Sequence, residues 1–122
     1  MVQEFDGNIH QFTTVDIQVE TGAAYEKSQF NYFKCRQVLN AIDDTSENIN
    51  FNASRLRSAK PGDPIPFIAM DPFRMFSAEI GAAGIWAEMR SLTNRFASEA
   101  FLTRFAERKL TGLRRRTEFE EI

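Results

Sequence analysis

The sequence predicts an α+β domain that is mainly helical, with a short N-terminal β-hairpin or arm and about three helices, the central one packed on two sides. Apolar and polar residues alternate near the N-terminus, apolar residues recur at helical spacing in three later segments, and a band of small residues interrupts the second of these. A chain of 122 residues, 43% of them apolar, also has the size and composition of one globular domain. That single domain, residues 1–122, divides into a strand region at 1–20, a helical core at 21–113 and a charged tail at 114–122.

The strand region begins with a turn signal. Asp6-Gly7-Asn8 is of the Asp-Gly type, and residues 15–20 then alternate between apolar and polar side chains. Two short strands are marginal in water on their own. We therefore expect them to pack on helices or to pair with the sheet edge of another chain.

Residues 23–42 form the first predicted helix. Phe30 and Phe33 fall nearly opposite its apolar stripe, so this helix lies between two layers or shows an aromatic patch to a partner. We assign Phe30 and Phe33 to a partner interface, because large aromatic side chains are enriched at interfaces. The stripe consists of Tyr25, Tyr32, Cys35, Leu39 and Ile42.

The pattern weakens between residues 45 and 70. Residues 49–53 alternate and fit a short strand. Residues 58–66 contain three prolines within six positions and form a loop. Pro61 and Pro64 have the PxxP spacing of polyproline ligands, but a rigid loop between helices is favoured over such a ligand.

Asp71 and Pro72 mark the start of the central helix, because aspartate caps helix N-termini and proline fits the first turn. Apolar residues lie on two of its sides, which places it between neighbours. Glycine inside a helix costs about 1 kcal/mol relative to alanine, so its band of small residues needs a compensating use. We expect the band to let another helix cross at short distance; the alternative is a kink that divides two shorter helices. The band consists of Gly81, Ala82, Ala83 and Gly84.

Residues 98–113 form the last predicted helix, with Gly112 near its end. Whether this helix is continuous with the preceding one stays open. Between residues 90 and 116, eight basic side chains stand against two acidic ones, a local charge of +6, although the whole chain has a formal charge of -2. An acidic tail follows, in which Phe119 and Ile122 are the apolar residues of a segment that either docks on a neighbour or frays.

The sequence carries no signal for catalysis, a cofactor or a metal site. His10 is the single histidine and Cys35 the single cysteine, which excludes a histidine pair for a metal, a disulfide within the chain and a thiolate zinc cluster. Motifs for phosphate loops and nucleophile elbows are also absent. We therefore expect a protein that is not an enzyme.

Because no apolar run approaches the length of about 20 residues that a membrane span needs, we expect a cytoplasmic protein without a membrane contact.

The predicted function is that of a non-enzymatic protein–protein interaction or assembly subunit, which self-associates as a homo-oligomer or docks in a larger complex. Such subunits occur in virion and filament assemblies, in secretion chaperones and among small inhibitors of larger machines. The 12 phenylalanines and the excess of arginine over lysine support this prediction, because both residue types are enriched at interfaces. The predicted partner interface comprises Phe30, Phe33, Arg104, Arg108, Phe119 and Ile122.

A nucleic-acid-associated protein is the alternative. Clustered basic side chains attract phosphates in a salt-dependent way. The acidic residues that follow the cluster compete for it, so ion pairs within or between chains are favoured over phosphate binding. The predicted nucleic-acid contacts are Arg104, Arg108, Lys109, Arg114, Arg115 and Arg116.

Overall fold

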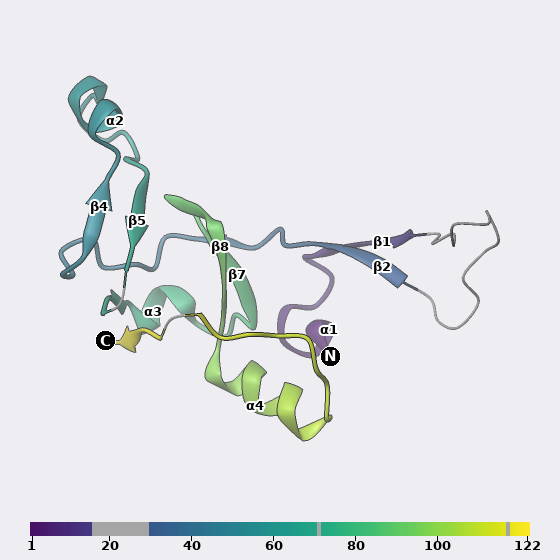
Figure 1. The fold of residues 1–122 in the computed structure, drawn as a ribbon. Helices are drawn as coiled ribbons and strands as arrows, with labels where there is room; N and C mark the ends of the chain where they lie inside the picture. Colours follow the sequence, from purple (N-terminus) through teal and green to yellow (C-terminus); the bar gives the residue numbers. More distant parts are fainter. Residues whose placement is uncertain (16–29, 71, 117) are drawn as a thin grey trace.

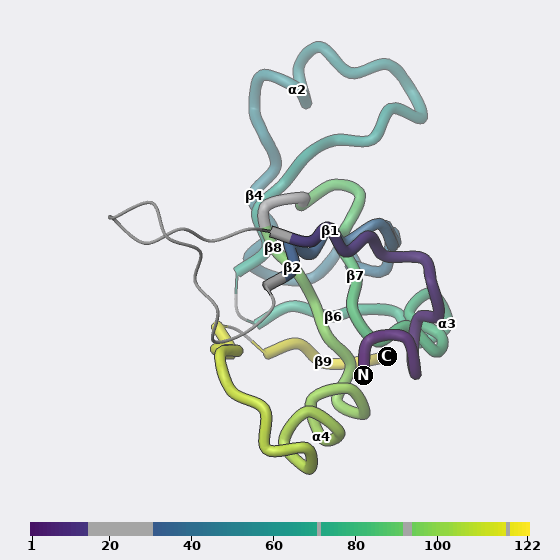
Figure 2. The backbone as a smooth tube through the Cα atoms, turned by 90° about the vertical axis from the view of Figure 1, so that its right-hand side faces the viewer, coloured from purple at the N-terminus to yellow at the C-terminus, as the bar shows by residue number. Residues whose placement is uncertain are grey.

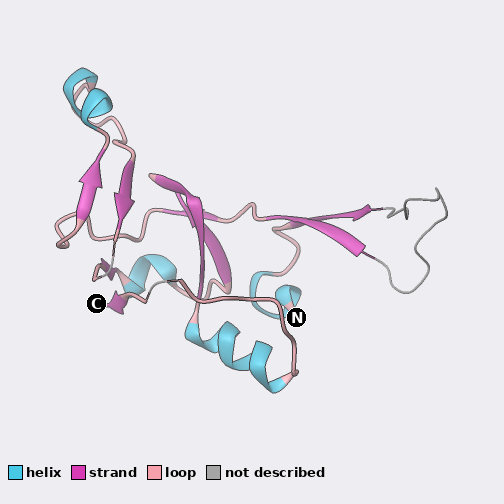
Figure 3. Ribbon diagram, viewed as in Figure 1, coloured by secondary structure: helices cyan, strands magenta, loops and turns pink. Residues whose placement is uncertain are grey.

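The structure is a computed structural model and describes residues 1–15, 30–70, 72–116 and 118–122, with the backbone alone at positions 15, 30, 92 and 93. In these ranges more residues lie in strands than in helices (Figures 1 and 3). The prediction of a mainly helical domain is therefore wrong. The four helices in these ranges are short: α1 Val2–Asp6, α2 Ala53–Ser58, α3 Ser77–Ile80 and α4 Glu99–Glu107.

The centre of the molecule is a three-stranded sheet with the strand order β3-β7-β8. β3 (Val38–Leu39) runs parallel to β7 (Ile85–Glu88), and β7 runs antiparallel to β8 (Ser91–Ala97). The register of β7 and β8 shifts near the end of β7, as it does at a bulge. Trp86 lies in the middle strand, and its side chain is completely buried.

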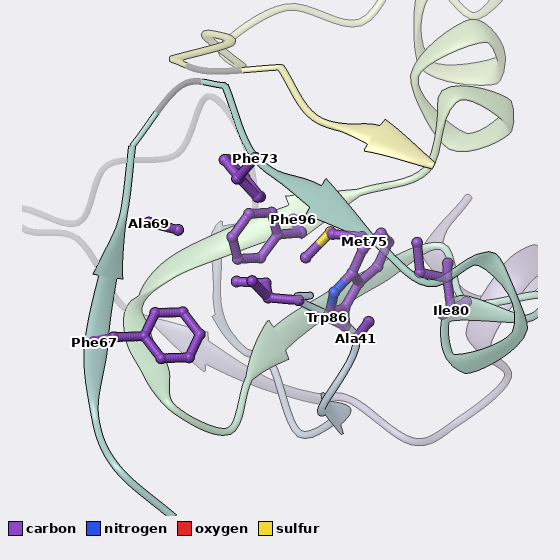
Figure 4. Packing of buried hydrophobic residues seen from close by; sticks show 10 residues of the cluster. Ala41, Phe67, Ala69, Phe73, Met75, Ile80, Trp86 and Phe96 are labelled. Atoms are coloured by element: carbon purple, nitrogen blue, oxygen red, sulfur yellow. The ribbon is translucent and has the colours of Figure 1, made fainter. Parts of the chain in front are cut away.

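A small second sheet completes the core. β6 (Arg74–Met75) pairs in parallel with β9 (Glu120–Glu121), and Met75 also forms an isolated bridge with Ile42. Buried side chains from these elements gather around Trp86 (Figure 4). The cluster comprises Ala41, Ile42, Phe67, Ala69, Phe73, Met75, Ile80, Ala83, Trp86 and Phe96, with Leu39, Ile49 and Phe119 packed against it.

Two antiparallel ribbons project from this core (Figure 1). β1 (Gln11–Val15) pairs with β2 (Phe30–Lys34), and β4 (Ile49–Phe51) pairs with β5 (Phe67–Ala69). The β4–β5 ribbon is anchored to the core by Phe67 and Ala69 and carries α2 at its tip, and α2 stands clear of the core in the perpendicular view as well (Figure 2). The molecule therefore combines a small core with two arms.

The helix predicted over residues 23–42 is wrong in its described part, which forms β2 and β3; its beginning lies outside the described residues. Aromatic side chains favour extended chain, where successive residues point to opposite faces. Phe33 accordingly faces Phe12 across the ribbon, with ring centroids 5.3 Å apart, while Tyr32 points to the other face. The spacing of the apolar residues fits a helix as well as a strand, and the pairing of β2 with β1 stabilises the strand.

The central helix predicted from Pro72 is also wrong, as is the alternative of two helices divided by a kink, because the chain forms β6, the short helix α3 and β7. Gly81 ends α3 with a φ of 55°, a left-handed conformation that favours glycine. A Cβ at Gly84 would lie 2.6 Å from the Cβ of Phe5, so Gly84 allows α1 to approach. The small residues Gly81, Ala82, Ala83 and Gly84 thus lie at a turn and at a close approach, not in a helix crossing.

Shorter elements agree better with expectation. Of the strand region predicted at residues 1–20, residues 11–15 form β1 after a turn at Gly7, but residues 2–6 form the helix α1 and the partner strand β2 lies outside this region. Residues 16–20 lie outside the described residues. The strand expected at residues 49–53 is confirmed over residues 49–51 as β4, whereas Ala53 begins α2, and a loop without helix or strand connects α2 to β5.

The last predicted helix is confirmed at its start. The Ser98 hydroxyl accepts a hydrogen bond from the backbone N–H of Phe101, which caps α4. The helix ends at Glu107, well before the predicted end, and Lys109 then adopts a φ of 54°. Because β8 precedes α4, the last helix is not continuous with an earlier one.

Candidate functional site

A cavity of about 970 Å³ lies between β8, α4 and the C-terminal segment, and we call it the C-terminal groove. Its apolar lining consists of Ile68, Ala69, Phe73, Ile85, Phe96, Ala97, Phe101, Leu102, Leu113 and Phe119. Its polar lining consists of Asn94, Arg95, Glu99, Arg114, Arg115, Arg116, Glu118 and Glu121. A concave, mainly apolar surface with a few charged groups is typical of ligand sites.

Aromatic rings from distant parts of the chain form the floor of this groove. The ring of Phe119 lies 6.0 Å from that of Phe73 and 6.1 Å from that of Phe96, and Phe73 and Phe96 are 6.2 Å apart. Such aromatic pairs contribute about 0.5–1.5 kcal/mol each beyond the burial of area. The floor is therefore held by packing between segments that the sequence separates.

Arg115 closes one side of the groove. Its Nη1 lies 2.9 Å from Oε1 of Glu118, and its Nη2 lies 2.7 Å from Oε1 of Glu99. The hydrogen bond with Glu118 and the charge of Glu99 raise the pKa of Arg115. Because all three side chains are exposed, the two pairs orient the rim but add little stability.

Arg114 and Arg116 flank Arg115, and the three side chains line a second hollow of about 410 Å³. Among the described residues, neither Arg114 nor Arg116 takes part in an ion pair. Both are exposed, and a guanidinium presents its donors in a planar fork that fits carboxylate or phosphate oxygens. The rim of the groove can therefore bind an anion.

The two arginines predicted on the last helix do not line the groove but hold α1. Arg104 Nε lies 3.3 Å from Oε2 of Glu4, and Arg108 pairs with the other oxygen of the same carboxylate. Next to Glu4, the ring of Phe5 packs edge-on against that of Phe101 at 5.4 Å. Arg104 and Arg108 are thus engaged by an acidic residue of their own chain.

The C-terminal tail docks on the core of its own chain. The backbone N–H of Ile122 donates to the carbonyl oxygen of Met75 at 2.9 Å, and its carbonyl oxygen accepts from the N–H of Ser77 at 2.9 Å. Phe119 packs in the aromatic floor, whereas the side chain of Ile122 is half exposed. The tail therefore completes the core.

Phe33 lies on a different surface, the β1–β2 ribbon, where its ring is 5.2 Å from that of His10. The side chain of Phe30 lies outside the described residues. Lys109 is exposed just beyond α4. Among the described residues of the predicted sites, the arginine run and Phe119 meet at the groove and the others do not.

Two buried carboxylates that bind backbone N–H groups of distant segments were not predicted from the sequence, and the first is Asp6. It accepts hydrogen bonds from the backbone N–H groups of Gly84 and Ile85 at 2.6 and 2.9 Å. It also accepts from the side chains of Gln37 and His10 at 3.0 and 2.9 Å. Burial alone raises the pKa of Asp6, but these hydrogen bonds outweigh burial, so that the pKa is lowered. Asp6 therefore fastens α1 to the start of β7.

The partner of Asp6, His10, is not accessible to a substrate. Its Nδ1 accepts from the backbone N–H of Arg36 at 3.1 Å, which assigns the ring proton to Nε2, where it donates to Asp6. The exposed fractions of the His10 and Asp6 side chains are 0% and 1%. This pair is therefore a structural link between segments.

The second buried carboxylate is Glu88 in β7. It accepts hydrogen bonds from the backbone N–H groups of Ala41 and Ile42 at 3.0 and 3.4 Å, and from the indole N–H of Trp86 at 3.1 Å. Burial raises the pKa of Glu88, and the hydrogen bonds oppose this effect in part. The single hint in the sequence is that Trp86 and Glu88 share a face of one strand.

The comparisons with known proteins do not assign a function. No family model matches the chain, and no curated protein or solved structure matches it significantly. No group of three His, Cys, Asp or Glu side chains suited to a metal ion occurs within the described part of the chain. None of the described helices has the length and apolar character to cross a membrane. The function of the protein is therefore inferred from its surfaces.

Proposed function

We propose that this protein is a non-enzymatic interaction or assembly subunit that self-associates or docks in a larger complex through its two projecting ribbons. The observation that carries this proposal is that both ribbons project from the core (Figure 1) and that both bear large exposed apolar residues. Two-stranded ribbons are marginal in water on their own, and clustered exposed apolar side chains mark interaction surfaces.

The β1–β2 ribbon presents aromatic rings on both faces. Phe12 and Phe33 form a cross-strand pair on one face, and Tyr32, which is 67% exposed, points to the other face. Aromatic rings supply large contact areas at a small cost in conformational entropy. This ribbon therefore suits a position between two partner surfaces.

The β4–β5 ribbon presents an aliphatic patch. Phe67 and Ala69 point into the core, so that Ile68 and the following Met70 share the outer face and are more than half exposed. Leu56 on α2 is exposed at the tip of the same ribbon. A partner that covers this face would remove the patch from water.

The non-enzymatic part of the proposal is supported by the inaccessible His10–Asp6 pair. Burial also raises the pKa of the Cys35 thiol, which lowers the fraction of reactive thiolate. A free cysteine fits a reducing compartment, and we propose the cytoplasm.

Light scattering over a wide concentration range tests the proposal. We expect the molar mass of the parent to rise with concentration, and the double variant Tyr32→Ser/Ile68→Ser to remain monomeric. Both side chains are mainly exposed, so that the variant keeps the core intact. Leu110→Ser is the matched control, because Leu110 is exposed but lies on neither ribbon.

A double variant with the same mass as the parent at every concentration would contradict self-association through the ribbons. A parent that stays monomeric removes self-association and leaves docking on a different protein. Co-purification then tests docking: equal recovery of partner proteins with the parent and with the double variant would contradict the proposal.

Nucleic-acid binding is the second candidate, because Lys109, Arg114 and Arg116 are exposed and have no ion pair among the described residues. Carboxylates of the same chain engage Arg104 and Arg108, which weakens this candidate. The ratio of absorbance at 260 and 280 nm, recorded at low and high salt during light scattering, tests it. Nucleic acid that co-purifies at low salt and leaves at high salt would favour it.

A further inference from the structure

The region around α4 already binds an acidic residue next to a phenylalanine. Glu4 pairs with Arg104 and Arg108, and the neighbouring Phe5 packs against Phe101. Two guanidinium groups thus hold the carboxylate while an aromatic ring receives the phenylalanine.

The C-terminal tail repeats this arrangement from the other end of the chain. Glu118 pairs with Arg115 at 2.9 Å, and the next residue, Phe119, packs against Phe73 and Phe96. In Figure 1 the tail passes beside α4 on its way to β9. Two segments with the same pair of residue types are therefore each held by an ion pair with arginine and by aromatic packing.

The C-terminal groove offers room for a third such segment. Its volume of about 970 Å³ is at the upper end of the range of about 300–1,000 Å³ for ligand clefts. Phe96 and Leu102 contribute to its apolar lining, and Arg114 and Arg116 lie at its rim without an ion pair among the described residues. The groove thus combines an aromatic floor with two guanidinium groups.

We infer that the C-terminal groove binds an acidic, phenylalanine-bearing segment of a partner protein, with carboxylates on Arg114 and Arg116 and the ring on the aromatic floor. A small inorganic anion would leave that floor uncovered. The groove shares Ile68 and Ala69 with the β4–β5 ribbon, but Arg114 and Arg116 lie on neither ribbon, so that substitutions at these two arginines test this inference apart from self-association.

Fluorescence anisotropy with the full-length protein tests the inference. The probe is a labelled peptide with the sequence of residues 117–122, which contains one phenylalanine among three glutamates. We expect saturable binding that weakens at least about tenfold in the double variant Arg114→Gln/Arg116→Gln, because two charge-assisted contacts are lost. The matched control is Arg55→Gln/Arg57→Gln on α2, which removes the same charge from a distant arm and is expected to change affinity less than about twofold.

Two further experiments distinguish this mode of binding from attraction by charge alone and from displacement of the chain's own tail. A peptide with alanine in place of phenylalanine is expected to bind weakly, and equal binding would overturn the inference, because charge alone would then explain the affinity. A probe that merely displaced the chain's own tail would depend on Arg115, which holds Glu118. Loss of binding in Arg115→Gln with full binding in Arg114→Gln/Arg116→Gln would therefore also overturn it.

A labelled oligothymidylate, titrated at the same salt concentration, tests the competing class of ligand. Tighter binding of the oligothymidylate than of the peptide, lost in Arg114→Gln/Arg116→Gln, would assign the rim to nucleic acid and overturn the inference. Far-UV circular dichroism checks that each variant folds. Leu113→Asp provides an independent variant, because this exposed residue lines the groove and a carboxylate there repels the acidic peptide.

Discussion

The core around Trp86 and the β1–β2 ribbon use the same kind of side chain in opposite surroundings. Trp86 is completely buried and packs on Phe96 and Phe119, with ring centroids 6.0 and 6.2 Å apart. On the ribbon, Phe12 is 42% exposed and Tyr32 is 67% exposed. The difference teaches that the aromatic residues of this chain serve stability at the centre and contact at the ribbon.

Polar groups reinforce this contrast. At the core, the carboxylates of Asp6 and Glu88 bind backbone N–H groups of segments far away in the sequence. The described strands of the ribbon are joined chiefly by their own ladder and by the Phe12–Phe33 contact. Local stability is therefore expected to be high at the core and low on the ribbon.

Replacing Trp86 by alanine has the largest expected effect. The change leaves a cavity and removes the indole donor of the buried Glu88, so we expect the free energy of unfolding to fall by about 3–5 kcal/mol. Urea denaturation measures this loss. Phe12→Ala on the ribbon is the contrast, with an expected loss below about 1 kcal/mol. Equal losses in the two variants would contradict the division between core and ribbon.

Asp6→Asn tests the polar ties of the core. An amide carries no charge and cannot accept from all four donors, so we expect the free energy of unfolding to fall by about 3 kcal/mol at neutral pH. The folded-state pKa of Asp6 lies below its ordinary value of 3.8, so the contribution of the ionised group is complete above that value and is lost as the pH falls through the folded-state pKa. Denaturation at a series of pH values should therefore show a smaller difference between parent and variant in acid.

Glu88→Gln is the control, because the stability that Glu88 contributes is expected to depend on pH in the opposite direction to that of Asp6. Because the folded-state pKa of Glu88 lies above its ordinary value of 4.5, the folded chain holds this proton more tightly than the unfolded chain. The stability that this group contributes is present below pH 4.5 and is lost as the pH rises through the folded-state pKa. Parallel pH curves for the parent and both variants would disprove the two assignments together.

Gly84→Ala has a smaller expected effect that is local to α1. The new methyl group would lie 2.6 Å from the Cβ of Phe5, so the helix must move, and we expect a loss of about 1–2 kcal/mol. Faster hydrogen exchange at residues 2–6 should accompany this loss. Ala82→Ser is the matched control at an exposed position of the same small-residue band, and equal exchange in both variants would refute the close approach.

Tyr32→Ser has the smallest expected effect on folding. We expect the free energy of unfolding to change by less than about 0.5 kcal/mol, because the side chain is mainly exposed. Association measured by light scattering should nevertheless weaken. A variant that loses stability and keeps full association would reverse the roles assigned to the core and the ribbon.

Local chemistry made some elements predictable. Ser98 caps α4 with its own hydroxyl, and the turn at Gly7 follows an Asp-Gly signal in adjacent residues. The helices expected at residues 23–42 and from Pro72 were wrong because a spacing of three and four over a few apolar residues is also compatible with paired strands. The pairing of β3 with β7 and of β6 with β9 decides between the two, and it joins segments that no local pattern links.

The candidate site was predictable to a similar extent. The arginine run at residues 114–116 is evident as charge in the sequence. The floor beside it depends on Phe73, Phe96 and Phe119, which meet through tertiary packing. The hydrogen bonds of Asp6 were beyond prediction because backbone N–H groups occur in every segment and carry no sequence signal.

The hydrogen bonds to Asp6 join segments that the ribosome makes at different times. Gly84 and Ile85 follow Asp6 by 78 and 79 positions. At about 5–20 residues per second, they are added about 4–16 s after it. During that interval the carboxylate faces water, and the five residues of α1 are too few to persist as an isolated helix. The N-terminal helix is therefore expected to settle late in biosynthesis, although its own residues are translated well before those that hold it.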